Sequence, residues 1–317
     1  MVLPLRAEGS RPVIATANAV RYCGATPVFV DIEAGSFNID ARLIEAALTP
    51  RTKAILCVHQ LGMPCDLAGI VAIGARHGIP VIEDAACAIG SEIQWNGRWE
   101  KIGKPHGDIA CFSFHPRKVV TTGDGGMITT RQASFDRQFR LWRQHSMSTP
   151  DTVRHGSKDV TFESYDELGF NYRMTDLQAA VGRVQLTRLP AILEERRRIA
   201  AEYAAHLRSI PGLQVPTEPS WAKTNWQSFC VMLPEGVEQR AVMQQLLDKG
   251  ISTRRGVMNS HLEKAYASSS PLRLPRSEAA QTRGVILPLS SGMTGEQVRD
   301  ICEHLALAID ASAACRP

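Results

Sequence analysis

The chain has 317 residues, of which 44% are hydrophobic and 21% charged, a composition typical of a globular protein and not of a disordered one. Lys and Arg total 36 and Asp and Glu 32, and the scattered net charge of +4 gives no indication of a nucleic-acid partner. The eight cysteines form no C-x-x-C pair and no zinc-like spacing with histidine, which argues against a metal site. No apolar run has membrane-spanning length and the start lacks signal-peptide order, so the sequence predicts a cytoplasmic protein that does not bind membranes.

The first half of the chain alternates β-branched runs with helical patterns. Apolar runs predict strands at 26–32, 53–59, 79–86, 108–114 and 126–130, and amphipathic patterns predict helices at 40–48 and 66–78. Asp40 and Asp66 stand where they can cap these helices, and Gly78 where it can end the second. This alternation predicts a mainly parallel sheet with helices on both faces. Ligands of such sheets bind at the carboxyl ends of the strands, and Asp84 and Lys118 follow two of those ends.

The second half predicts a long helix and a smaller unit. The pattern from Thr175 is strongly helical, and Pro190 predicts a kink or a break in it. The basic run "EERRRIA" at 194–200 is expected to be a solvated helix face. A strand at 227–233 and helices at 238–250 and 294–310 complete the chain. We expect two domains, a large α/β domain over residues 1–190 and, over 191–317, the long helix with a small C-terminal α/β domain.

Three residues match the needs of one cofactor. Pyridoxal phosphate requires a lysine for its Schiff base and a carboxylate that keeps its ring nitrogen protonated. It also requires hydroxyl and backbone N–H groups for its phosphate. Lys118, Asp84 and Ser113 can supply these groups. A single strand-end aspartate is most often a cap or turn residue, and a single lysine beside a glycine turn is most often solvated, so only the combination suggests the cofactor.

These residues lie in segments that resemble the DegT/StrS-type sugar aminotransferases of fold type I, which depend on pyridoxal phosphate. The resemblance is carried by "VIEDAACAIGSE", by "GDIACFSFHPRKVVTTGDGGMITT" and by "GFNYRMTDLQAAVGRVQL". It extends from about Ile14 to the C-terminal helix. The fold it implies is the mainly parallel sheet flanked by helices, with a smaller C-terminal α/β domain and with the family's first strand–helix region missing.

The resemblance assigns roles to particular positions. It implies that Lys118 forms the Schiff base, that Asp84 pairs with the ring nitrogen and that Ser113 binds the phosphate. Ala86 matches the small residue packed on one face of the ring. Asn171 matches an asparagine that reaches the phosphate in the neighbouring subunit, which implies a homodimer with shared sites. His261 and Arg254 fall in the loop on the substrate side.

The implied reaction transfers an amino group from L-glutamate to a nucleotide-linked keto-sugar, as in polysaccharide biosynthesis. Related sugar dehydratases carry histidine in place of the lysine, so Lys118 favours amino transfer. Elimination or dehydration of a sugar is a weaker alternative that also uses the cofactor.

Three departures from the family pattern leave a further alternative. The lead that carries a phosphate-binding Gly-Ser/Thr-Ala loop is missing, and Val13 replaces an aromatic residue expected to stack on the ring. Cys87 replaces the Gln or His near the phenolic oxygen of the cofactor, and a thiol is a weaker hydrogen-bonding group. The alternative is therefore a truncated homologue of impaired activity, acting as an inactive protein or as a partner subunit.

Overall fold

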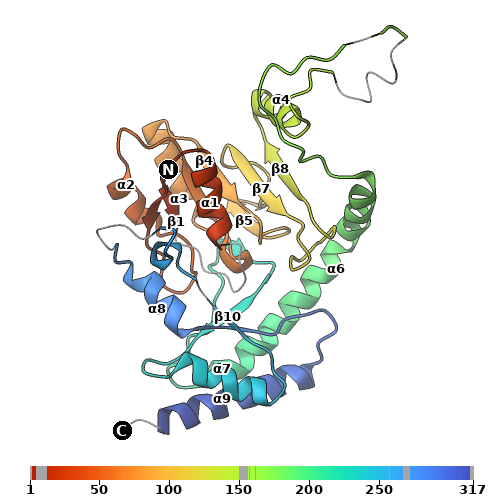
Figure 1. Ribbon diagram of the computed structural model, residues 1–317. Helices are drawn as coiled ribbons and strands as arrows, with labels where there is room; N and C mark the ends of the chain where they lie inside the picture. The colour runs from red at the N-terminus through yellow and green to blue at the C-terminus, as the bar shows by residue number, and fades with distance from the viewer. Residues whose placement is uncertain are drawn as a thin grey trace.

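A six-stranded sheet lies at the centre of the N-terminal part of the molecule (Figure 1). The computed structural model describes residues 2–4, 13–149, 156, 158–160, 162–256, 258–266 and 272–314. The strands stand in the order β2-β1-β3-β4-β7-β8: β1 (Val2–Pro4), β2 (Val28–Val30), β3 (Ile55–Val58), β4 (Val81–Asp84), β7 (Ile109–Ser113) and β8 (Gly126–Thr130). All neighbours pair in parallel except β7 and β8, which are antiparallel. The predicted, mainly parallel sheet is confirmed.

Helices cover both faces of this sheet, as predicted. Successive strand residues point to opposite faces, so β3 presents Leu56 and Val58 on one face and Ile55 and Cys57 on the other. The first face packs against α1 (Val13–Tyr22). The second face packs against α2 (Ile44–Ala47) and α3 (Leu67–His77).

The expected caps are present. The Asp66 side chain accepts a hydrogen bond from the Gly69 N–H at the start of α3, and Gly78 ends that helix with a φ of 63°. Asp40 accepts from the Arg42 N–H. The segment after Asp40 is shorter than the predicted helix, because it begins as the 3₁₀ turn η1 (Ala41–Leu43) before it becomes α2.

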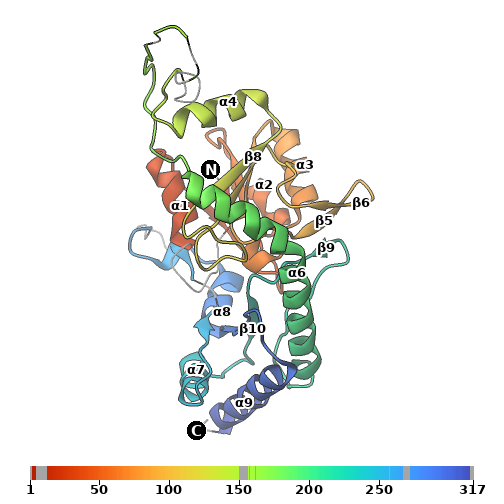
Figure 2. The same cartoon turned by 90° about the vertical axis from the view of Figure 1, so that its right-hand side faces the viewer.

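The long helix α6 (Asp176–Leu207) runs through Pro190 as one continuous helix. Of the predicted kink or break, the break is therefore wrong. Figure 2 shows that the helix changes direction along its length. The prediction of a fully solvated basic face is also wrong in part, because Arg196 is buried. Its guanidinium donates to the carbonyl oxygens of Trp226 and Gln227 at 2.8 and 2.9 Å.

The C-terminal part has a second core around an antiparallel sheet in the order β10-β12-β11. Its elements are β10 (Phe229–Met232), α7 (Gln239–Asp248), β11 (Arg254–Arg255), η3 (Ser260–Leu262), α8 (Pro275–Arg283), β12 (Gly284–Leu287) and α9 (Gly295–Ala314). Tyr203 of α6 stacks on Phe229 within this core. Leu189 and Leu193, earlier in α6, pack instead with residues of the N-terminal part. The helix α6 thus contributes to two clusters of buried side chains, and the division into two domains stays a prediction.

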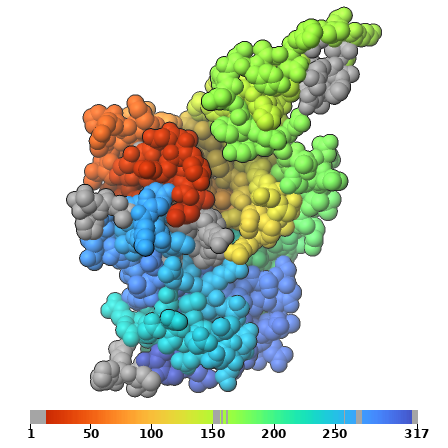
Figure 3. Space-filling model, viewed as in Figure 1, coloured from red at the N-terminus to blue at the C-terminus, as the bar shows by residue number. Residues whose placement is uncertain are grey.

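Two smaller features complete the fold. The hairpin of β5 (Glu92–Trp95) and β6 (Arg98–Lys101) pairs with β9 (Ala222–Lys223). Between β8 and α6 the chain forms an arm, whose described residues are 133–149, 156, 158–160 and 162–175 and which begins with α4 (Ala133–Trp142). The α4 end of this arm stands away from the rest of the surface in Figure 3. Among the helices of the described residues, none is both long and apolar enough to span a membrane.

Candidate active site

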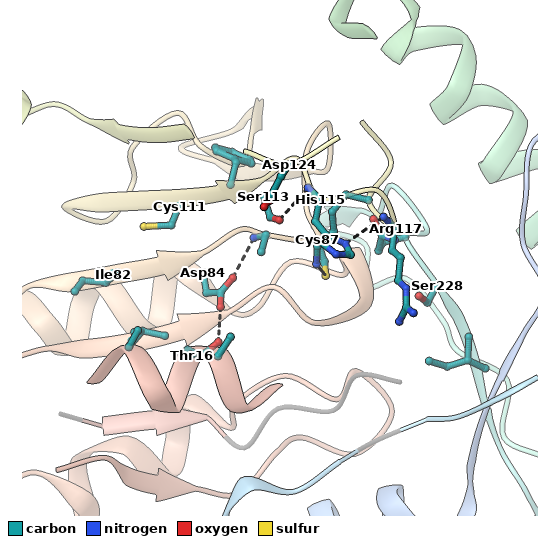
Figure 4. A pocket seen from close by; sticks show the side chains of 18 of the residues that line it. Thr16, Ile82, Asp84, Cys87, Cys111, Ser113, His115, Arg117, Asp124 and Ser228 are labelled. Atoms are coloured by element: carbon teal, nitrogen blue, oxygen red, sulfur yellow. Dashed lines mark hydrogen bonds between the residues drawn. The ribbon is translucent and has the colours of Figure 1, made fainter. Parts of the chain in front are cut away.

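A pocket of about 680 Å³ opens where the carboxyl ends of β4 and β7 face the C-terminal sheet. Residues of α1 border it on one side, and Gln227, Ser228 and Ile286 on another. Six of the predicted site residues line it, namely Asp84, Ala86, Cys87, Ser113, Lys118 and Arg254. Figure 4 shows Asp84 and Thr16 on one side of this pocket, with His115 and Arg117 on the side of Ser228.

Asp84 is the last residue of β4, and both of its carboxylate oxygens accept hydrogen bonds. The Thr16 hydroxyl donates to Oδ2 at 2.6 Å and the Ala86 N–H donates to Oδ1 at 3.0 Å. Figure 4 shows the Thr16 side chain reaching Asp84 from α1. Thr16 was not predicted as a site residue, because it lies 68 residues from its partner and no local pattern links the two.

Lys118 lies in the loop after β7, and its Nζ is 3.0 Å from the Cys87 sulfur. The loop is fixed from the C-terminal part of the chain. The Gln227 side chain accepts from the Val119 N–H at 3.0 Å and donates to the Arg117 carbonyl oxygen at 2.8 Å. Gln227, which no local sequence pattern marks as a site residue, thus holds the residues on both sides of the lysine.

The glycine turn that follows the lysine returns the chain to the sheet. The Phe114 N–H donates to the Gly125 carbonyl oxygen, and Gly126 begins β8. A Cβ atom at Gly126 would lie 2.6 Å from the Phe112 carbonyl oxygen, a contact that backbone atoms cannot relieve by a side-chain rotation. Gly125 has a φ of +147°, which side-chain-bearing residues rarely adopt. The glycines therefore permit the close β7–β8 turn that carries Lys118.

The remaining lining groups are polar or small. Ser113 is the last residue of β7, and its hydroxyl accepts a hydrogen bond from the His115 N–H at 3.3 Å. The Asn225 side-chain amide donates to the Cys87 carbonyl oxygen at 2.7 Å, so the backbone that carries the thiol is anchored. Burial, reinforced by the carboxylates of Asp84 and Glu83, raises the pKa of the Cys111 thiol to about 12.

Two predicted site residues are not among the residues that line the pocket. Asn171 is exposed in the segment that leads into α6, where it forms an isolated bridge with Gln144. His261 lies in η3 and is buried, with Nε2 3.4 Å from the Glu278 carboxylate. Burial lowers the His261 pKa. The roles of Asn171 toward a partner subunit and of His261 toward the substrate stay predictions.

The pocket fits pyridoxal phosphate. Its volume is within the range of roughly 300–1,000 Å³ that is usual for small-molecule sites. A lysine amine, a strand-end carboxylate with both oxygens already positioned and a strand-end hydroxyl all border the same space. Ala86 adds only a methyl group to the lining, which leaves room for a flat ring.

Comparison with known proteins agrees with this geometry. Residues 11–306 match the DegT/DnrJ/EryC1/StrS aminotransferase family. The chain belongs to this family. It is therefore a pyridoxal-phosphate-dependent aminotransferase, and its mixed sheet flanked by helices is the α/β architecture of fold type I.

Two curated relatives illustrate the match. The chain is 38% identical to UDP-N-acetyl-3-dehydro-alpha-D-glucosamine 3-aminotransferase of Acidithiobacillus ferrooxidans over 91% of this chain and 73% of that protein. It is 40% identical to GDP-perosamine synthase of Caulobacter vibrioides over 89% of this chain and 72% of that protein. Among solved structures, DesI in the presence of its TDP-sugar product superposes with a TM-score of 0.83 at 29% identity, covering 99% of this chain and 76% of that one.

Proposed function

We propose that this aminotransferase moves an amino group from L-glutamate to a nucleotide-linked keto-sugar. The observation that carries the proposal is the shared pocket of Lys118 and Asp84, at the strand ends of a family member whose relatives are named for sugar amination. The relatives carry UDP-, GDP- and TDP-sugars in their names, so the acceptor is assigned as a class and not as one compound. We place the reaction in the cytoplasm from the sequence alone.

Pyridoxal phosphate, when bound, accepts the amino group of the donor and passes it to the acceptor. The residues of the chain then divide the remaining work. With the cofactor bound, Lys118 Nζ would accept and return the proton of the donor carbon, and general acid–base catalysis of this kind contributes roughly 10²–10⁴-fold. Asp84 would hold the proton on the ring nitrogen, and the Thr16 hydroxyl donates to the Asp84 carboxylate that would do so.

Other groups in the pocket are assigned to binding. The Ser113 hydroxyl and the nearby backbone are suited to the cofactor phosphate, and Ala86 and Cys87 to the ring. Arg254 lines the same pocket from β11, where a cation suits an anionic part of the donor or acceptor. We keep His261 as a residue that supports this side of the pocket, since it contacts Glu278 and is not in the lining.

We also propose that the enzyme is a homodimer whose sites are completed across the interface. Large hydrophobic side chains are exposed along the arm and the first turns of α6, including Phe162, Leu168, Leu177 and Val184. Contiguous apolar surface of this kind marks interaction sites in soluble proteins. Asn171 lies within the same segment and is exposed, which supports its proposed contact with a phosphate in the other subunit.

Cofactor binding by the purified chain tests the proposal. Titration with pyridoxal phosphate is expected to give a visible absorbance band in the wild-type chain and none in Lys118→Ala. Lys118→Arg, which keeps the positive charge, is the matched control and should also lack the band. Release of α-ketoglutarate from glutamate should follow when a nucleotide-linked keto-sugar is added.

Each failure has its own meaning. Absence of the band at saturating cofactor would contradict the proposal and favour the impaired homologue. A normal band without α-ketoglutarate would instead favour elimination or dehydration of the sugar.

A further inference from the structure

The Cys87 thiol and the Lys118 amine are in direct contact, with Sγ and Nζ 3.0 Å apart. Both partners are fixed by bonds made from outside the pair. Asn225 holds the Cys87 carbonyl oxygen, while Gln227 holds the loop on both sides of Lys118. The Cys87 residue is only 1% exposed. The backbone segments that carry the thiol and the amine are therefore both anchored by other parts of the chain.

The chemistry of the two groups decides where a shared proton resides. The ordinary pKa values are about 8.5 for a thiol and about 10.4 for a lysine amine, a difference of roughly two units in favour of the nitrogen. A neighbouring lysine also stabilises a thiolate. Burial disfavours each charge taken singly, but opposite charges in contact compensate one another.

Other ionisable groups line the same pocket and come from several elements. They are Asp84 at the end of β4, Cys111 in β7, His115, Arg117 and Asp124 in the loop, and Arg254 in β11. The two arginines favour the thiolate, and the two carboxylates favour the ammonium. Cys111 provides a contrast in the same pocket, since burial and the carboxylates of Asp84 and Glu83 raise its pKa to about 12.

We propose that Cys87 and Lys118 form a thiolate–ammonium ion pair in the cofactor-free chain. The pair makes Cys87 a positioning residue that keeps the Lys118 amine protonated and in place. It also lowers the pH at which the Cys87 thiol ionises. Lys118 must lose this proton before it can attack the cofactor aldehyde, so Cys87 sets the pH at which the enzyme is loaded.

Alkylation of the cofactor-free chain tests the ion pair directly. Iodoacetamide reacts with thiolates, so the alkylation rate at each cysteine reports the ionisation of that thiol. Mass spectrometry would follow this rate between about pH 5 and about pH 10, in steps of about one pH unit. Exposed Cys23 serves as an ordinary reference thiol, and Cys111 as a pocket thiol expected to stay protonated.

In the wild-type chain, the alkylation rate of Cys87 should rise at a lower pH than the alkylation rate of Cys23. Lys118→Met removes the charge at similar length and should slow Cys87 alkylation at neutral pH by about tenfold or more, since a nearby opposite charge shifts a pKa by roughly 1–3 units. Lys118→Arg should retain the fast reaction. The methionine side chain covers the thiol no more than the lysine does, so a change in access to the thiol cannot explain a slower rate. An unchanged Cys87 profile in Lys118→Met would overturn the proposal.

The rate of cofactor loading provides a second measurement. Cys87→Ser replaces the thiol by a hydroxyl that stays neutral, so the pH midpoint for development of the absorbance band should fall by about one unit. A midpoint that stays in place or rises would contradict the proposed effect of Cys87 on Lys118. This second test rests on the proposed function because it needs Lys118 to react with pyridoxal phosphate. The alkylation test does not, so the two ideas can fail separately.

Discussion

At the scale of single residues, the Asp84 carboxylate is oriented by groups from two different elements. Thr16 donates to one oxygen from α1, and the Ala86 N–H donates to the other from the turn after β4. A carboxylate held in this way cannot rotate freely, so little reorganisation is needed when it meets a protonated ring nitrogen. Preorganised polar groups of this kind are more effective than mobile ones.

Replacement of Thr16 tests this orientation. Thr16→Val keeps the shape of the side chain and removes the hydroxyl, and a hydrogen bond to a charged group contributes about 1.5–3 kcal/mol. The dissociation constant for pyridoxal phosphate should therefore rise by about tenfold or more, measured by absorbance titration. Thr16→Ser restores the donor and should bind nearly as the wild type does. Equal affinities for the Val and Ser variants would exclude a role for the hydroxyl.

At this scale the sequence predicted the side chains that line the pocket but not the side chains that hold them in place. Asp84, Ser113 and Lys118 were found because each ends or follows a strand with a readable local pattern. Thr16 and Gln227 were missed because they reach the site across long separations, 68 residues from Thr16 to Asp84 and 108 from Gln227 to Val119. Local periodicity contains no information about such contacts.

At the scale of elements, α6 connects the C-terminal core to the loop that carries the lysine. The buried Arg196 guanidinium holds the carbonyl oxygens of Trp226 and Gln227, and the Gln227 side chain in turn holds the loop. Burial lowers the pKa of Arg196 to about 10, which leaves the group charged at neutral pH. A charged donor in a buried position strengthens these hydrogen bonds.

Arg196→Met tests whether the hydrogen bonds from Arg196 to Trp226 and Gln227 support the loop that carries Lys118. The variant leaves two carbonyl oxygens without their donor, and an unsatisfied buried group costs about 1–3 kcal/mol. We expect a lower free energy of unfolding in urea and weaker binding of pyridoxal phosphate. Arg188→Met on the exposed side of the same helix is the control, expected to stay close to the wild type. A stable Arg196→Met chain with normal cofactor binding would show that α6 does not support the loop.

The elements themselves were largely predictable, with informative exceptions. Strong local signals gave the sheet and the caps at Asp40, Asp66 and Gly78, and the structure confirms them. The strand β1 has three residues, too few to show a period. Of the kink or break expected at Pro190, the break did not occur, since proline removes one hydrogen bond but packing on either side of it keeps α6 helical. Arg196 was taken as solvated because charge alone does not reveal a helix buried on several sides.

At the scale of the whole molecule, large apolar side chains on the first turns of α6 are exposed in a single chain. Leu177 and Val184, seven residues apart on one side of α6, are 81% and 61% exposed. Residues at this spacing share a helix face. A second copy of the chain is the proposed cover.

The double variant Leu177→Glu, Val184→Glu is expected to dissociate the dimer, because two carboxylates would be buried without partners. Light scattering after size exclusion should then report the mass of one chain. Leu307→Glu, at a 65% exposed position of α9 in the C-terminal part, is the matched control and should remain dimeric. A monomeric wild type would refute the dimer, and a dimeric double variant would place its interface elsewhere.

The pocket lining extends along almost the entire chain, from Ala15 in α1 to Ile286 in β12. Protein synthesis proceeds from the N-terminus, and domains fold as their segments emerge. The sheet with Asp84 and Lys118 is therefore made first, but the wall formed by Gln227, Ser228 and Ile286 is added only near the end of translation. The part of the pocket that one chain supplies is not complete on the ribosome until most of the chain has left it, so loading with pyridoxal phosphate comes late in the synthesis of each molecule.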